Sequence, residues 1–383
     1  MRRYWILLTL LLLFCPQSGR ASEDFTIAAK AAVLIDGASG RILYGQNENE
    51  MLPEASCTKI MTALVAMENS DMDESVTAGI NAHGVTGTSL YLSEGETLSM
   101  EQMLYGLLLR SGNDAAVAIA EHVSGSVEEF ANLMNARAGE LNADAHFVNP
   151  HGLDADGHRA SALGLARIMR EALKRDDFRS ITGTQRKIIP WVGNDYSRVL
   201  ENKNRLLRTY EGATGGKTGY TSKAGRCLVF SAKRDGMELI GVVLNCPNWF
   251  DEAEKLLDYG FDRFKLYAAL DAGESAGRAS VLNGESADVS ATASERLAAA
   301  VPEGSKPELK TEFSSLSAPV RPGDGVGTAW LELDGEIIAR IHLVAGEDIP
   351  LRSLTTAFRR VMSRWSLIRP QLPAGTFAST PGR

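Results

Sequence analysis

The sequence predicts an α+β fold in which helices flank an antiparallel sheet, followed by a second, small β-rich domain. Runs with strand-like alternation lie near both ends of the first 267 residues and enclose several helical segments. After Tyr267 the composition changes to one rich in Gly, Ser, Ala and Pro. Strands at both ends favour an antiparallel sheet over the doubly wound parallel sheet that alternating strands and helices form.

Three hairpins are expected from the strand signals. Residues 30–45 contain two β-rich runs around a Gly-rich turn. Residues 226–245 contain two more, which turn at Asp235-Gly236. The third hairpin, at 328–344, lies in the second domain. The first two hairpins supply the strands of the main sheet.

Helices are expected between the first two hairpins. Residues 56–67 are apolar without strand-like alternation, which indicates a buried helix. Ser99 and Gln102 have the spacing of a capping box, which marks the start of another helix. The remaining helical segments are 100–109, 114–123, 126–141 and 161–174.

Length and composition set the domain count and exclude some functions. A chain of 383 residues favours two domains, expected at 22–267 and 268–350. Its net charge of −8 argues against nucleic acid as a partner, because phosphate contacts need clustered Lys and Arg. Four cysteines are too few for a disulfide scaffold, and we expect buried thiols.

Residues 1–21 have the pattern of a signal peptide. Arg2 and Arg3 give a positive start, and residues 6–14 are apolar apart from Thr9. Small residues then precede a cleavage site after Ala21. A nine-residue apolar helix is only about 13 Å long and cannot span a bilayer. The mature protein is therefore expected to be exported and to act outside the cytoplasm.

The C-terminal segment has the opposite charge to the rest of the chain. Residues 349–383 include six Arg and no acidic residue. Apolar residues recur there at helical spacing: Leu354, Phe358, Val361, Met362, Trp365 and Ile368. This pattern predicts an amphipathic helix at 351–369 that lies in a membrane surface, ended by Pro370 and followed by a flexible tail at 370–383. A helix packed on the second domain is the alternative.

Ser56 and Lys59 are the first candidates for chemistry. A spacing of three places both side chains on one helix face, about one turn apart. Free N–H groups at the helix start favour negative charge at Ser56 and disfavour a protonated Lys59. A desolvated, neutral lysine can take the serine proton. The neighbouring Cys57 points about 100° away around the helix and is expected to be a buried contact. Taken alone, this spacing also fits a capping serine with an unrelated lysine.

Two further motifs follow in a distinctive order. Ser111-Gly112-Asn113 lies in a break between two helices, 55 residues after Ser56. Lys217-Thr218-Gly219 follows 106 residues later, where the chain enters the second hairpin. A serine–lysine pair, Ser-x-Asn and Lys-Thr-Gly in this order match the signature set of serine penicillin-binding proteins and β-lactamases.

Over about residues 25–266 the chain resembles the low-molecular-mass penicillin-binding proteins that are D-alanyl-D-alanine carboxypeptidases (serine peptidase family S11). Residues around the motifs also match: Pro53-Glu54-Ala55, Ile60-Met61-Thr62-Ala63, Asn149-Pro150-His151-Gly152-Leu153 and Thr218-Gly219-Tyr220-Thr221. The resemblance implies the penicillin-recognition fold of transpeptidases and β-lactamases. It also implies that the terminal D-alanine is removed from peptidoglycan stem pentapeptides, and that penicillin inhibits the enzyme.

The resemblance also implies the role of each motif. Ser56 is the nucleophile, Lys59 its base, and Ser111 passes a proton to the leaving D-alanine. Asn113 holds the substrate amide, while Lys217 and Thr218 bind its terminal carboxylate. Gly219 and Tyr220 complete the substrate-binding strand, and the backbone N–H groups of Ser56 and Tyr220 form the oxyanion hole.

The expected partners are the stem pentapeptide, β-lactam antibiotics and, through the C-terminal helix, the outer face of the cytoplasmic membrane. No metal or organic cofactor is implied.

Three other functions remain open. A β-lactamase shares the motifs but needs a carboxylate to activate the deacylating water, and Glu128 with Asn132 has a suggestive separation. A non-catalytic penicillin-binding sensor or scaffold is the second. The third is a zinc peptidase that uses the nearby His146, His151, Asp154 and His158, although their spacing fits no zinc motif.

Overall fold

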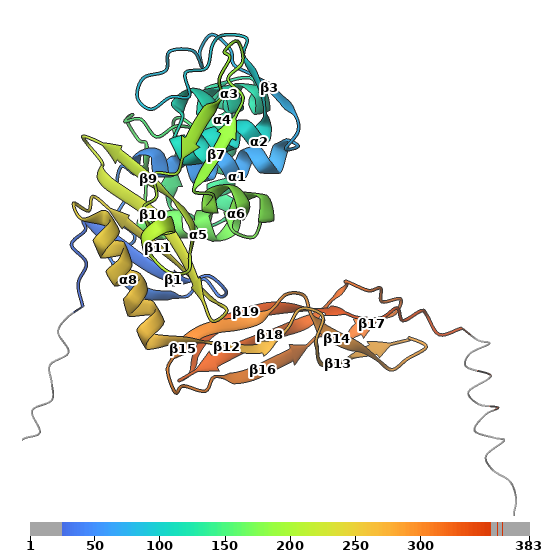
Figure 1. The fold of residues 1–383 in the computed structure, drawn as a ribbon. Coiled ribbons are helices and arrows are strands. Elements are labelled where there is room, and N and C mark those ends of the chain that lie inside the picture. Colours follow the sequence, from blue (N-terminus) through green and yellow to red (C-terminus); the bar gives the residue numbers. More distant parts are fainter. Residues whose placement is uncertain (1–24, 354–357, 359–361, 363–383) are drawn as a thin grey trace, which may run out of the picture.

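The computed structural model describes residues 25–353 together with Phe358 and Met362 (Figure 1). The predicted signal peptide at 1–21 lies outside the described residues, as does most of the predicted C-terminal helix and all of the tail at 370–383. Within the described residues, no helix is both long enough and apolar enough to cross a membrane.

A five-stranded antiparallel sheet lies at the centre of the larger part of the molecule, with strand order β2-β1-β11-β10-β9. Its strands are β1 (Ala31–Asp36), β2 (Ile42–Gln46), β9 (Ala213–Thr221), β10 (Gly225–Arg234) and β11 (Met237–Leu244). The first two predicted hairpins and the antiparallel sheet are thus confirmed. The N-terminal strand β1 pairs with β11 from the far end of the domain, with Ile35 opposite Ile240.

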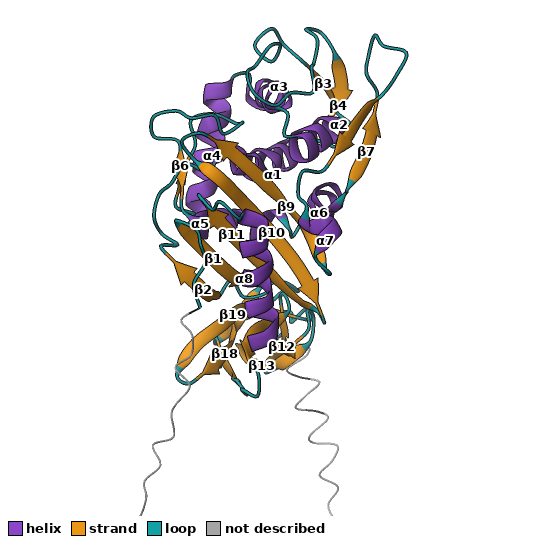
Figure 2. Ribbon diagram, turned by 60° about the vertical axis from the view of Figure 1, so that its left-hand side comes forward, coloured by secondary structure: helices purple, strands orange, loops and turns teal. Residues whose placement is uncertain are grey.

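Helices cover both faces of this sheet (Figure 2). The helix α8 (Trp249–Arg263) packs against β10 and β11 on one face. On the other face lies α5 (Ala162–Ala172), with α1 (Lys59–Asn69) buried behind it. Because apolar layers flank the sheet on two sides, every residue of β1 is buried. This explains why the strand reads as a continuous apolar run rather than an alternating one.

The predicted helices are confirmed, with two local differences near the motifs. The helix predicted from Ser56 begins as a 3-10 turn, η1 (Ala55–Thr58), and becomes α-helical at Lys59. The helix α2 (Met100–Tyr105) starts with the expected Ser99–Gln102 capping box and ends in a π-helical turn, η2 (Gly106–Arg110). The next two helices are α3 (Asn113–Ser124) and α4 (Val127–Glu140).

Several shorter elements were not predicted from the sequence. The hairpin of β7 (Arg186–Ile189) and β8 (Arg198–Glu201) follows α6 (Asp176–Gly183), and α7 (Leu206–Thr209) leads into β9. Two further ladders have only two or three residues in each strand. They are β3 (Ser75–Thr77) with β4 (Thr97–Ser99), and β5 (Ala145–His146) with β6 (Arg159–Ala160).

The second unit is built from strands and has an apolar core of its own. β12 (Phe264–Leu270) pairs with β15 (Leu297–Pro302), and the other strands form a sheet of order β16-β18-β19-β14-β13-β17. Those strands are β13 (Ser275–Leu282), β14 (Asp288–Ala293), β16 (Glu308–Phe313), β17 (Leu316–Ser317), β18 (Gly325–Leu333) and β19 (Glu336–Ala345). The predicted third hairpin is confirmed as β18–β19.

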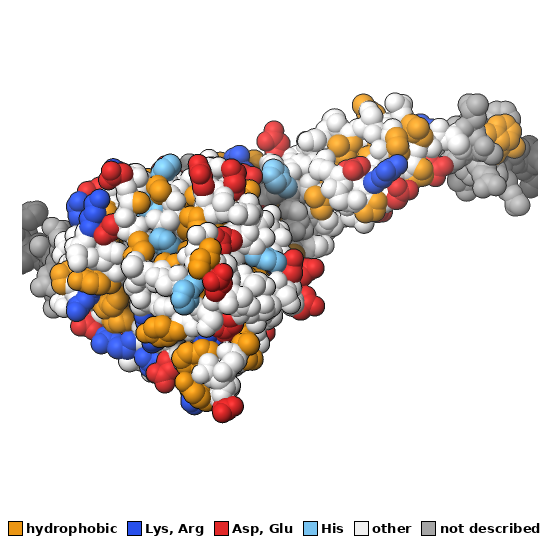
Figure 3. Space-filling view, turned by 90° about the horizontal axis from the view of Figure 1, so that it is seen from above, with side chains coloured by type: hydrophobic (Ala, Val, Ile, Leu, Met, Phe, Trp, Pro, Cys, Tyr) orange, Lys and Arg blue, Asp and Glu red, His pale blue; other side chains and the backbone are white. Residues whose placement is uncertain are grey.

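The second unit projects sideways from the end of the larger part that lies farthest from α3 (Figures 1 and 3). Asp36, at the end of β1, accepts a hydrogen bond from the backbone N–H of Ala300 at 3.0 Å, which ties the two units together. The view in Figure 3 shows acidic and basic side chains interspersed over the larger part.

Three cysteines lie in the described part of the chain, and all are free and buried, as expected. Burial raises the pKa of Cys57 well above its ordinary value and that of Cys227 to about 12. These thiols therefore behave as small apolar groups rather than as nucleophiles.

Candidate active site

Ser56 is presented by a strained turn at the start of a buried helix. The residue before it, Ala55, has a positive φ of 51°, which is uncommon for a residue other than glycine. Ser56 itself lies in the 3-10 turn η1 and is partly exposed, whereas the residues around it are buried. Its side chain makes no capping bond to α1, so the interpretation of Ser56 as a simple helix cap is not supported.

The Lys59 amine lies against the Ser56 hydroxyl. Lys59 Nζ lies 3.0 Å from Ser56 Oγ, which is hydrogen-bond distance for proton transfer. The same nitrogen contacts Asn113 Oδ1 at 2.7 Å and the backbone carbonyl of His151 at 2.6 Å. These contacts fix the amine at the position where the serine proton must leave.

Burial disfavours the charged form of the Lys59 amine. The side chain is fully buried, and this desolvation lowers the pKa of Lys59 well below its ordinary value. The positive charges of Lys217 and Lys203 lower it further. The lowered pKa expected from the sequence is confirmed in direction, with desolvation as the main cause.

A second serine–lysine pair stands opposite the first. Lys217 Nζ on β9 donates to Ser111 Oγ at 3.0 Å and to the backbone carbonyl of Thr218 at 2.8 Å. Ser111 follows the π-helical turn and has a left-handed backbone (φ 68°). Burial lowers the pKa of Lys217 to about 7. The contacts of Lys59 with Asn113 and of Lys217 with Ser111 bring the three predicted motifs into one site.

The Ser-Gly-Asn loop is held from behind by residues 86–92. The backbone N–H of Asn113 donates to the carbonyl of Thr88 at 2.8 Å, and its side-chain amide donates to that of Thr86 at 2.7 Å. The buried Asp114 carboxylate accepts the backbone N–H groups of Leu90 and Leu92. Asn113 therefore presents its oxygen to Lys59 in a fixed orientation.

Two glycines allow other segments to approach the Ser56 turn closely. A Cβ at Gly219 on β9 would lie 2.6 Å from the carbonyl oxygen of Glu54 and 3.1 Å from the Ser56 nitrogen. A Cβ at Gly152, whose φ is +83°, would lie 1.9 Å from the carbonyl oxygen of Ala55. Only glycine fits at either position, because any side chain would push the strand or the loop away from the nucleophile turn.

A buried polar cluster supports the same turn from below. Thr58 Oγ1 donates to Glu54 Oε1 at 2.9 Å and lies 2.9 Å from His158 Nε2. The backbone N–H of Val148 donates to His158 Nδ1, which leaves Nε2 as the protonated nitrogen of a neutral ring. His158 Nε2 is also 2.9 Å from the Glu54 carboxylate. The cluster links the nucleophile turn to the 148–158 loop.

A cleft of about 360 Å³ opens in front of these groups. Its lining residues are Ser56, Gly87, Thr88, Asn113, Gly152, Leu153, Lys203, Thr218, Gly219, Tyr220, Thr221 and Trp249. Lys59, Ser111 and Lys217 are buried behind this lining. The predicted residues Ser56, Asn113, Thr218, Gly219 and Tyr220 therefore face the cleft, and the other three act from beneath it.

Lys203 and Trp249 also line the cleft, and neither was predicted from the sequence. Lys203 lies between β8 and α7, and its pKa is lowered by burial and by the nearby charge of Arg110. No motif marks it, because its position depends on how the 198–209 segment folds against β9. The contact between Lys59 and the His151 carbonyl could not be predicted either, because a backbone acceptor has no sequence signature.

The residues of the zinc and β-lactamase alternatives do not form a site of their own. His151 contacts Lys59 only through its backbone carbonyl, and Asp154 accepts a hydrogen bond from Thr221 at the cleft. Among the described residues, no group of three or more His, Cys, Asp or Glu side chains could hold a metal ion. His146 contacts the backbone of Gly157, while His158 belongs to the buried cluster. Glu128 and Asn132 are exposed on α4, and none of the described residues lining the cleft is Asp or Glu.

Three features of this structure define the penicillin-binding class of serine enzymes. They are helices on both faces of an antiparallel sheet, a serine–lysine pair at a helix start, and a Lys-Thr-Gly strand beside that pair. The chain belongs to the D-alanyl-D-alanine carboxypeptidase family, whose model matches residues 17–248. The C-terminal domain of penicillin-binding protein 5 matches residues 261–351.

Individual relatives agree with this assignment over most of the chain. The D-alanyl-D-alanine carboxypeptidase DacF of Bacillus subtilis is 35% identical, over 92% of this chain and 94% of its own. DacC of Escherichia coli is 32% identical over 88% of this chain and 89% of its own. Among solved structures, penicillin-binding protein 5 from Haemophilus influenzae matches with a TM-score of 0.72 and 30% identity, covering 85% of this chain and 98% of that one.

Proposed function

We propose that this protein is a serine-type D-alanyl-D-alanine carboxypeptidase that removes the terminal D-alanine from peptidoglycan stem pentapeptides. The observation that carries the proposal is the 3.0 Å contact between a buried Lys59 amine, whose pKa is lowered, and the Ser56 hydroxyl. A neutral amine in this position is a competent base for a serine nucleophile. The family assignment supports the substrate.

In the proposed acylation, Lys59 takes the Ser56 proton while Ser56 Oγ attacks the carbonyl between the two D-alanines. The backbone N–H groups of Ser56 and Tyr220 would stabilise the negative oxygen, and the loss of one such donor typically costs about 3 kcal/mol. The close approach of β9 at Gly219 supports this pairing. Collapse of the intermediate breaks the peptide bond, and Ser111 passes a proton to the departing nitrogen. Water then hydrolyses the Ser56 ester and regenerates the enzyme.

The terminal carboxylate of the substrate is assigned to the basic end of the cleft. Thr218 and Lys203 line the cleft there, and Lys217 lies directly beneath. A carboxylate bound at this end gains from both lysine charges, and Asn113 would hold the amide on the other side of the scissile bond. A β-lactam presents a similar carboxylate and acyl group, and we expect it to acylate the same serine.

The first test is D-alanine release from a soluble stem pentapeptide. The wild-type protein should release one D-alanine per peptide, and Ser56→Ala should lower kcat/KM by about three orders of magnitude or more. Cys57→Ala is the matched control, because Cys57 is adjacent to Ser56 in the sequence and its thiol is buried. This variant should keep most of the activity. Undiminished release by Ser56→Ala would remove the basis of the proposal. Rapid turnover of penicillin instead of peptide would favour a β-lactamase.

The proposed domain organisation is 22–267 for the catalytic domain and 268–350 for the small β-rich domain, after a signal peptide at 1–21. This boundary falls within β12 (Phe264–Leu270), which pairs with β15 of the second unit along its whole length. We place the mature enzyme on the outer face of the cytoplasmic membrane, held peripherally by the segment 351–369. The excess of Arg in that segment supports this placement, as do the exposed Phe358 and Met362, which are four residues apart. Arginines near an anionic surface contribute about 1 kcal/mol each.

Truncation after Ser353 tests the membrane contact. This end point spares Ile349 and Leu351, which pair with Val320 and Gly284. We expect the truncated protein to lose binding to vesicles that contain anionic lipid, while it releases D-alanine from soluble peptide at the wild-type rate. Truncation after Pro370 is the control and should leave vesicle binding intact. Equal vesicle binding by all three forms, measured by co-sedimentation, would contradict the assignment.

A further inference from the structure

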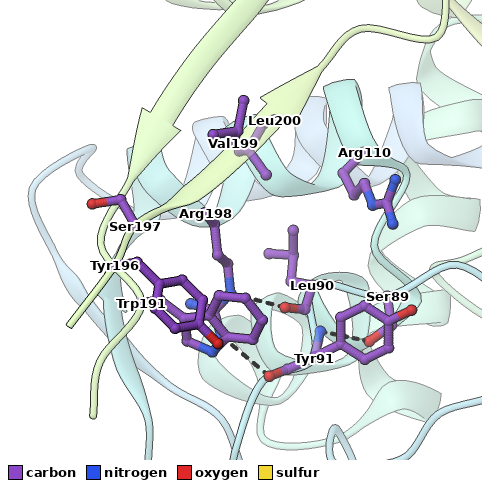
Figure 4. Close-up of a pocket in the computed structure, with 10 residues that line it drawn as sticks. All are labelled: Ser89, Leu90, Tyr91, Arg110, Trp191, Tyr196, Ser197, Arg198, Val199 and Leu200. Carbon is purple, nitrogen blue, oxygen red and sulfur yellow. Dashed lines mark hydrogen bonds between the residues drawn. The ribbon is translucent and has the colours of Figure 1, made fainter. Parts of the chain in front are cut away.

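Arg198 and Glu96 form a buried ion pair outside the active-site cleft. The guanidinium nitrogens Nη1 and Nη2 lie 2.5 and 2.8 Å from the two carboxylate oxygens, and both side chains are nearly fully buried. Arg198 lines a pocket of about 280 Å³ beneath the β7–β8 hairpin (Figure 4), and neither residue is among the described residues that line the cleft. Since a buried ion pair is often no more stabilising than well-packed apolar side chains, the contacts that Arg198 makes beyond Glu96 decide its role.

The other donors of Arg198 hold residues 86–92 (the 86–92 loop). Nε donates to the carbonyl of Leu90 at 2.8 Å, and Nη2 donates to that of Tyr91 at 3.2 Å, as the dashed lines in Figure 4 show. The Trp191 ring lies over the guanidinium, with its centroid 4.7 Å away. A guanidinium can bind the loop and the carboxylate together because it carries several N–H donors in a rigid, planar arrangement.

The backbone of Tyr91 shows that the 86–92 loop depends on such support. Its φ is +60°, a region that an aromatic residue rarely adopts. The side chain is 65% exposed, so its packing does not hold the backbone in this conformation. Hydrogen bonds do so instead: Tyr91 N–H donates to Ser89 Oγ at 2.8 Å, and its carbonyl accepts from Arg198. Strain of this kind persists only where the surroundings maintain it, and it is concentrated near functional sites.

The 86–92 loop in turn holds the Ser-Gly-Asn motif. Thr88 Oγ1 donates to the backbone carbonyl of Ser111 at 2.5 Å, and the Thr88 carbonyl accepts the N–H of Asn113 at 2.8 Å. These two motif residues are the ones whose side chains bind the active-site amines, Ser111 with Lys217 and Asn113 with Lys59. A shift of the loop would therefore move both partners of the catalytic lysines.

Leu90 connects Arg198 to the motif a second time. Its carbonyl accepts from Arg198, while its N–H donates to the buried carboxylate of Asp114 at 2.9 Å. Its side chain lies against Gly112, the middle residue of the motif, where an added Cβ would be 3.1 Å from Leu90 Cγ. The position of Leu90 is thus set by Arg198 on one side and transmitted to the motif on the other.

We propose that Arg198 is a positioning residue, which holds the 86–92 loop so that the Ser-Gly-Asn motif faces the two active-site lysines. The inference rests on the proposed function, in which Ser111 passes a proton and Asn113 holds the substrate amide. Without the donors of Arg198, the loop is expected to relax at the strained Tyr91 and to carry the motif with it. A displacement of about 1 Å at a reacting group can lower a rate by about 100-fold.

The first test replaces both members of the ion pair with apolar side chains, Arg198→Met together with Glu96→Leu. Removing both charges leaves neither of them buried without its partner, so the double variant should keep the fold. We expect kcat for D-alanine release from a soluble stem pentapeptide to fall by about 10- to 100-fold. KM should change far less, because the carboxylate site at Thr218 and Lys203 lies outside the loop.

Two single variants show which contact of the guanidinium matters. Arg198→Lys keeps a positive charge opposite Glu96 but cannot bind both loop carbonyls as a planar fork does, so its kcat should fall to a similar extent. Arg179→Met is the matched control and should keep the wild-type kcat. Arg179 forms a two-pronged ion pair with Glu238 at 2.7 Å, and in the described part of the chain its side chain makes no hydrogen bond to the 86–92 loop.

Two further variants separate positioning from a general loss of stability. In an Asn113→Ala background the double replacement should lower kcat by a smaller factor, because one of the side chains that it misplaces is already gone. A loss of folded protein would instead lower the rate by the same factor in both backgrounds. Tyr91→Gly added to the double replacement should restore part of the lost kcat, since glycine adopts the positive φ without support.

The outcomes bear separately on the positioning role and on the proposed function. A loss of kcat that is smaller in the Asn113→Ala background and partly restored by Tyr91→Gly supports the positioning role. Wild-type kcat in Arg198→Lys, equal factors in the two backgrounds, or no restoration by Tyr91→Gly would overturn it. Arg198→Lys retains the ion pair and carries the test if the double replacement does not fold. If the wild-type protein released no D-alanine, the proposed function itself would fail, whereas wild-type rates in every variant would leave that function standing.

Discussion

Lys59→Met is expected to abolish D-alanine release, with a loss in kcat/KM of about three orders of magnitude or more. Methionine matches the length of the lysine stem but has no proton acceptor to lie 3.0 Å from Ser56 Oγ. Lys59→Arg should be equally inactive, because a guanidinium stays protonated and cannot act as the base. If Lys59 acted only through its positive charge, Lys59→Arg would keep its activity. This pair of variants therefore separates a base from a purely electrostatic role.

The expected effect of Lys59→Met on stability is small, because two contributions oppose each other. Because the pKa of Lys59 is lowered on folding, the folded protein binds fewer protons than the unfolded chain. Lys59 therefore destabilises the folded state at neutral pH, and this destabilisation decreases as the pH rises. Removing it lifts that penalty, but it leaves the acceptors Asn113 Oδ1 and the His151 carbonyl without their donor. The melting temperature of the variant should differ less between pH 6 and pH 9 than that of the wild-type protein.

The control for this experiment is Lys223→Met. Lys223 is an exposed lysine in the turn between β9 and β10, outside the cleft lining. Its replacement should leave both D-alanine release and the pH dependence of the melts unchanged. Wild-type rates in Lys59→Met would contradict the assignment of Lys59 as the base.

The pH profile of kcat/KM is expected to be bell-shaped, with its alkaline limb near pH 7. The acid limb belongs to Lys59, which must be neutral to accept the Ser56 proton and whose pKa is lowered. The alkaline limb belongs to Lys217, whose pKa of about 7 means that its positive charge is lost as the pH rises through neutrality. Because a substrate carboxylate favours the protonated amine, KM should rise by about tenfold per pH unit above the limb.

Lys217→Arg should remove the alkaline limb, because arginine stays charged throughout the accessible range. Altered geometry is expected to lower the activity of the variant at its optimum, so the readout is the shape of its pH profile. His151 is not expected to contribute a limb, since burial lowers its pKa to about 3. An alkaline limb that persists near pH 7 in Lys217→Arg would assign it to another group.

The chemistry of the site was predictable where it depends on local spacing. Ser56 and Lys59 are three residues apart, and the turn they share fixes their contact almost independently of the rest of the fold. The capping residue Ser99 and the hairpin turn at Asp235-Gly236 were predictable for the same reason, because each is a local hydrogen-bonding or backbone preference.

Features that depend on distant segments were not predictable from the sequence. The lysine Lys203 reaches the cleft only because the 198–209 segment packs beside β9, and nothing in its neighbours marks it. The hairpin β7–β8 has strands of four residues each, too short for an alternating pattern to stand out. The strained Tyr91 is held by Arg198, which is 107 residues away in the chain.

The use of Ser56 as the nucleophile is tested most directly by intact mass and peptide mapping after incubation with penicillin. The expected result is one covalent penicilloyl group per chain, located on Ser56 and absent from Ser56→Ala. An unmodified chain, or a label on the neighbouring Cys57, would contradict the proposed site.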